Sequence, residues 1–69
     1  MSAELKARRI ISLLSLEQII DQFEITETLD DPDIPTVRGW LMDELQKRDR
    51  DAFDRWLSDF ADSPRPYFL

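Results

Sequence analysis

Apolar residues recur every three to four positions in four segments of this chain, and this spacing constrains the fold more than any other feature. Side chains at positions i, i+3, i+4 and i+7 share one face of an α-helix. No segment shows the alternation of β-branched residues that is typical of strands. The sequence therefore predicts an all-α fold, a small three- or four-helix bundle whose core holds these residues. The four sets are Ala7, Ile10, Ile11 and Leu14; Leu16, Ile19, Ile20 and Phe23; Val37, Trp40, Leu41 and Leu45; and Phe53, Trp56, Leu57 and Phe60.

Capping residues predict where the helices begin. Ser15 with Gln18 three residues later forms the pattern of a capping box, which favours a helix break at Ser15 over one continuous helix across residues 3–24. Thr36, directly after a proline, is the expected cap of the third helix. Asp49 is the expected cap of the fourth.

The length of 69 residues predicts a single small helical domain spanning residues 1–69. A chain of this size buries only about 60% of the surface that it exposes when unfolded, so its core is thin. Within the domain we expect an N-terminal helix or arm over residues 1–14, an acidic linker over 26–35 and an aromatic tail over 62–69. The linker is rich in Asp and Pro, which favour turns.

The charge is acidic and unevenly distributed. The formal net charge is −6, yet residues 1–14 carry three bases against one acid, whereas residues 15–34 carry seven acids and no base. An acidic protein is repelled by nucleic acid unless a basic face compensates, so a nucleic-acid partner is not expected. Two alternatives stay open: a helix-turn-helix regulator presenting Thr36 and Arg38 to DNA, and an inhibitor whose acidic stretch mimics DNA.

The residue types argue against an enzyme. The chain has no cysteine and no histidine, so the commonest nucleophile, general base and transition-metal ligands are missing together. Asp30, Asp31 and Asp33 supply oxygen atoms of the kind that calcium prefers, but the order of an EF-hand is missing and Pro32 stiffens the segment. We expect a solvated acidic turn, with no metal and no cofactor.

The N-terminus resembles a signal peptide only superficially. Its positive charge precedes an apolar run, but Ser12, Ser15 and Glu17 interrupt that run and no small-residue cleavage site follows. No segment approaches the roughly 18 apolar residues of a membrane span. The expected setting is the cytoplasm, without a membrane partner.

Gly39 is the only glycine, and it lies within the third predicted helix, where glycine costs roughly 1 kcal/mol relative to alanine. On a helical wheel it falls almost opposite the apolar stripe. Three interpretations stay open: the aromatic tail covers it, a partner protein or second copy of the chain contacts it, or it has no role. We expect an interaction surface for an unidentified protein, with a homodimer as one possibility, formed by Arg38, Gly39, Met42, Gln46, Tyr67 and Phe68.

The run "DIPTVRGWLMDELQKRDRDAFDRWL", with the closing "PRPYF", resembles a group of short bacterial proteins of no assigned function encoded on conjugative elements and prophages. The resemblance covers about residues 16–68 and is most specific at "TVRGW" and "AFDRWL". It implies a mobile-element setting and no catalytic residues. Together these features predict a small acidic accessory or regulatory protein that acts by protein–protein interaction.

Overall fold

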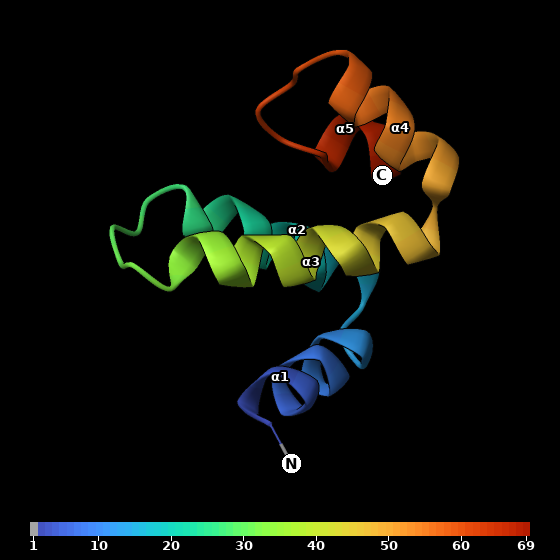
Figure 1. The fold of residues 1–69 in the computed structure, drawn as a ribbon. Coiled ribbons are helices and arrows are strands. Elements are labelled where there is room, and N and C mark those ends of the chain that lie inside the picture. Colours follow the sequence, from blue (N-terminus) through green and yellow to red (C-terminus); the bar gives the residue numbers. More distant parts are fainter. Residues whose placement is uncertain (1) are drawn as a thin grey trace.

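The longest helix, α3 (Ile34–Arg48), lies at the centre of the fold and contacts three of the other helices. In the computed structural model, which describes residues 2–69, α1 (Ala3–Ser12) and α2 (Leu16–Thr26) precede it, and α4 (Arg50–Ser58) and the single turn α5 (Arg65–Phe68) follow. Figure 1 shows α2 and α3 side by side and antiparallel, with α1 on one side of this pair and α4 with α5 on the other. The described residues contain no strand, and the prediction of a small all-α bundle is confirmed.

Two predicted helix starts are confirmed. The Ser15 hydroxyl accepts the Gln18 backbone N–H at 3.1 Å, and the Gln18 side chain accepts the Ser15 N–H at 2.8 Å, which completes the capping box. The Asp49 carboxylate accepts the Ala52 N–H at 3.0 Å at the start of α4. Because α1 ends before Ser15, the chain turns there instead of forming one long helix.

The predicted start of the third helix is wrong. The helix begins at Ile34, with Asp33 as its N-cap, so Thr36 lies in its first turn. Pro35 is tolerated there because the first four backbone N–H groups of a helix have no partner within it, and a proline loses nothing by lacking one. Asp31 accepts the Asp33 N–H at 2.9 Å and closes the turn that precedes the helix.

The core forms between α2, α3 and α4, with one residue from α1. The Phe23 ring meets the Trp56 ring edge to face, with centroids 5.2 Å apart, an arrangement that aromatic pairs favour. Trp40 is only half-buried at the edge of this cluster. The buried residues of this cluster were all predicted as core: Ile11, Ile19, Ile20, Phe23, Leu41, Leu45, Phe53 and Trp56.

Three predicted core residues are not in the core. Phe60 is 92% exposed, Ile10 is 54% exposed and Leu57 is 43% exposed, so the prediction for all three was wrong. Phe60 is exposed because α4 ends at Ser58, two residues before the end of the predicted apolar stripe. Phe60 then takes a left-handed backbone conformation with φ 53°, which turns its side chain away from the helix face that carries Trp56.

Candidate interaction surface

Four of the six residues predicted to form an interaction surface serve the fold instead. Arg38 donates to the Thr26 hydroxyl at 2.9 Å, and its guanidinium carbon lies 4.2 Å from the centre of the Phe23 ring. This cation–π contact closes one side of the core. The other three residues are partly buried apolar side chains that pack against the core: Met42, Tyr67 and Phe68.

The remaining two residues, Gly39 and Gln46, are exposed on α3. A Cβ atom added to Gly39 would meet nothing within 4 Å. The interpretation that the aromatic tail covers this glycine is therefore wrong. The other two interpretations of Gly39 stay open: a contact with a partner, and a glycine without a role.

The tail folds back onto α4 and α2. Arg65 forms ion pairs with Asp21 and with Glu24, the latter at 2.7 Å, and the Ser63 hydroxyl donates to Glu24 at 2.6 Å. The hydrogen bonds from Arg65 and Ser63 lower the pKa of Glu24 to about 2. This cluster holds the one-turn helix α5 on α2.

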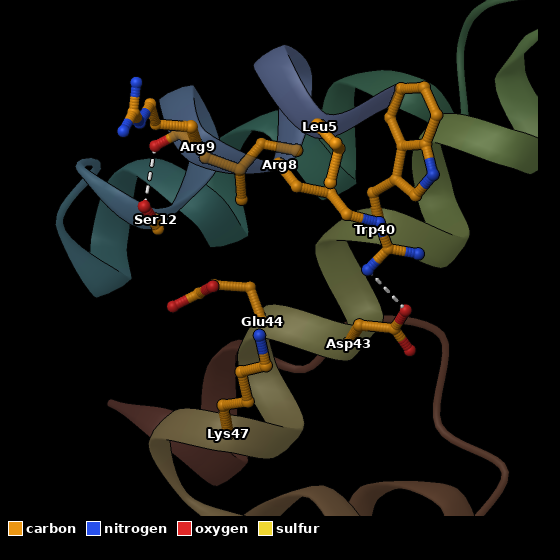
Figure 2. A pocket seen from close by; sticks show the side chains of 9 residues that line it. Leu5, Arg8, Arg9, Ser12, Trp40, Asp43, Glu44 and Lys47 are labelled. Carbon is orange, nitrogen blue, oxygen red and sulfur yellow. Dashed lines mark hydrogen bonds and ion pairs between the residues drawn. The ribbon is translucent and has the colours of Figure 1, made fainter. Parts of the chain in front are cut away.

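A groove of about 320 Å³ separates α1 from α3, and its walls are largely charged. Figure 2 shows Arg8 and Asp43 pointing toward each other across it, with their side-chain atoms 2.9 Å apart. At its end, Arg48 donates to the Ser12 carbonyl at 3.1 Å and to Glu44 at 2.9 Å. These bonds hold α1 on α3, while Arg9 and Lys47 of the same groove form no ion pair within the described part of the chain.

A second groove, of about 310 Å³, lies between α1, α2 and α3 and is mostly apolar. Gln22 and Thr26 supply its polar atoms, and the Thr26 hydroxyl is already bonded to the Phe23 carbonyl and to Arg38. Such a concave apolar site is of the size that proteins use to bind a ligand group. Its aliphatic lining consists of Ile10, Ile11, Leu14, Val37 and Leu41.

Phe60 is the most exposed of the large apolar side chains. A positive φ is a genuine outlier for a bulky residue, and at this position after a helix most proteins place glycine. Sequence reasoning missed this residue because no glycine, asparagine or proline marks the end of α4. The only signal for a helix end was the segment "ADSP", which follows Phe60. A helix that ended there would still include Phe60 on its apolar face.

The residues on both sides of Phe60 are held in place. Tyr67 donates its hydroxyl to Asp59 at 2.6 Å, and Trp56 donates its indole N–H to the Ala61 carbonyl at 2.8 Å. The hydrogen bond to Asp59, assisted by partial burial, raises the pKa of Tyr67. The aromatic side chain is therefore presented to solvent from a fixed backbone.

Within residues 2–69, no group of three or more possible ligands is placed to hold a metal ion. No helix in this part of the chain has the length and apolar character needed to cross a membrane. No family model, curated protein or solved structure matches the chain.

Proposed function

We propose that this chain is a small, acidic, non-enzymatic accessory protein that works in the cytoplasm by binding another protein, with Phe60 at the centre of the contact. The observation that carries the proposal is a phenylalanine that is 92% exposed in a left-handed backbone conformation. The resemblance of residues 16–68 to proteins of mobile elements supports a setting on such an element.

Phe60 is unfavourable for the isolated fold. The left-handed conformation costs an L-residue about 1–2 kcal/mol, and glycine would avoid this cost. An exposed ring gains almost no burial in return. Strained residues of this kind persist where the strain serves a function, and exposed aromatics are typical anchors of protein interfaces.

The fixed backbone adds to this argument. Ordering a loop at an interface costs free energy, and a loop that is already ordered avoids that cost. The hydrogen bonds at Asp59 and Ala61 order the residues next to Phe60 before any partner arrives. A rigid backbone with a projecting aromatic ring suits insertion into an apolar pocket.

No observation favours the two nucleic-acid alternatives. The helices α2 and α3 form an antiparallel pair (Figure 1), whereas the helices of a helix-turn-helix cross at about 90–120°. Arg38, the residue expected to reach DNA, is bonded to Thr26.

The test replaces Phe60 with the photoreactive analogue benzoylphenylalanine in the native host. We expect illumination to join position 60 to one defined protein, because this ring lies inside the contact. The matched control carries the analogue at Asp54, an exposed position of the preceding helix α4. Equal adducts from both positions, or none from position 60, would contradict the proposal.

A second variant separates function from folding. Phe60→Gly should remove the ring that contacts the partner. It should also stabilise the fold by about 1 kcal/mol, which raises the Tm of a domain this small by roughly 4–8 °C. Thermal unfolding by circular dichroism measures this. A lower Tm would show that Phe60 stabilises the fold and that its conformation carries no functional meaning.

A further inference from the structure

We infer that the pocket that receives Phe60 is the apolar groove between α1, α2 and α3 of a second copy of this chain. The inference rests on the proposed function and names its partner. It joins two features that the fold leaves unused, an aromatic ring without a pocket and a pocket without an occupant.

The groove has the size and chemistry that a phenyl ring requires. A dry apolar cavity of about 150 Å³ is enough to bind benzene, and this groove measures about 310 Å³. Ile10 and Val37 lie on opposite helices of its aliphatic lining. The Thr26 hydroxyl is already hydrogen-bonded within its own chain. A ring that enters the groove would therefore break none of its hydrogen bonds.

The charges beside the ring and on the α1 wall of the groove are opposite in sign, while two of the three acids on the α2 wall are paired with Arg65. Phe60 lies between two exposed acids, Asp59 and Asp62, in the loop that follows α4. The helix α1, which forms one wall of the groove, carries a net positive charge, and within residues 2–69 its Lys6 and Arg9 form no ion pair. Complementary charge of this kind fixes which surfaces meet and in which orientation.

The arrangement of the helices determines the form of the assembly. Phe60 follows α4, on one side of the α2–α3 pair, while the groove borders α1 on the other side (Figure 1). A ring and a groove on opposite sides cannot meet in one two-fold symmetric contact. The contact is therefore head to tail, and each copy offers a free ring and a free groove for further growth.

Sedimentation equilibrium of the purified chain tests this inference. We expect the average mass to rise from the 8.2 kDa of one copy toward dimers and longer oligomers as the concentration increases. Phe60→Gly, which lacks the ring, and Ile10→Glu, which places a charge in the groove, should each stay monomeric. Leu13→Glu is the matched control, since Leu13 is an exposed apolar residue at the end of α1 that does not line this groove.

Mixing the two monomeric variants gives the decisive result. Phe60→Gly keeps its groove and Ile10→Glu keeps its ring, so together they have one complete contact and should form a 1:1 dimer that grows no further. If Ile10→Glu does not fold, Gln22→Trp, at an exposed position on the rim, replaces it.

Two outcomes would overturn the inference: a wild-type chain that stays monomeric at every concentration, or a mixture that forms no dimer. The proposed function is tested separately by the photoreactive analogue. A defined adduct with a different protein, together with a monomeric wild type, would overturn the second-copy partner and keep Phe60 as the contact.

Discussion

Tyr67 and Asp59 show how a single hydrogen bond can control the backbone beside an interaction residue. The Tyr67 hydroxyl holds the carboxylate of Asp59 at 2.6 Å, and Asp59 directly precedes Phe60 in the chain. Ionisation of the tyrosine would break this hydrogen bond, which is the main reason that the pKa of Tyr67 is raised; partial burial and the negative charge of Asp59 raise it further.

This bond can be observed directly, because Tyr67 is the only tyrosine of the chain. We expect the ultraviolet absorbance of tyrosinate to appear at a pH above the ordinary value of about 10. Because the folded-state pKa is raised, the bond stabilises the fold below the ordinary pKa, and this contribution is lost as the pH rises through the folded value. In Asp59→Asn the transition should move back toward the ordinary pKa, and an unchanged transition would contradict the hydrogen bond.

For single residues, the sequence correctly predicted two helix caps but wrongly predicted Phe60 as a core residue. Ser15 and Asp49 were identified because a cap is recognised by residues within three positions of it. Phe60 continued the helical spacing of Phe53 and Trp56, so periodicity placed it in the core. Only its backbone angle reveals its exposure, and no residue type in the segment specifies that angle.

Among the elements, α5 depends most on contacts with distant parts of the chain. A helix of four residues has no stability of its own, since isolated helices need about 12–15 residues. Arg65 holds it on α2 through Asp21 and Glu24. The sequence could not predict this position, because the partners lie more than forty residues apart and neither forms a recognisable motif.

The attachment of α5 should depend on acid pH. The pKa of Glu24 is lowered from 4.5 to about 2, so its ion pair contributes stability above pH 4.5 and loses it as the pH falls through about 2. Glu24→Gln should therefore be less stable than wild type at neutral pH, and the difference should shrink across this window. Urea unfolding at several pH values measures it. Glu27→Gln, at an exposed position of the same region, is the control for the loss of one carboxylate outside this ion-pair cluster.

At the scale of the whole molecule, stability depends on one small core around Trp56. This side chain meets the rings of Phe23 and Phe53 and is buried. A domain of this length has a free energy of unfolding of only about 3–10 kcal/mol. Apolar spacing predicted almost all of the core. It predicted neither groove, because the shape of a groove depends on how α1 packs on α3 and not on the sequence of one segment.

Trp56→Ala should unfold the protein, since truncation of a buried aromatic costs about 3–5 kcal/mol. Circular dichroism should show the loss of a cooperative thermal transition. Trp56→Phe keeps most of the buried area and loses the hydrogen bond to Ala61, so it should fold with a stability lower by about 1 kcal/mol. A cooperative melt of Trp56→Ala close to that of wild type would contradict the core described above.

The left-handed backbone at Phe60 also has an evolutionary consequence. Replacement by glycine or asparagine should improve folding, so the proposed binding would account for a phenylalanine at this position. A descendant that no longer needs its partner should drift to glycine or asparagine here while the buried residues stay apolar. The identity of residue 60 in each lineage would then record whether the partnership has survived there.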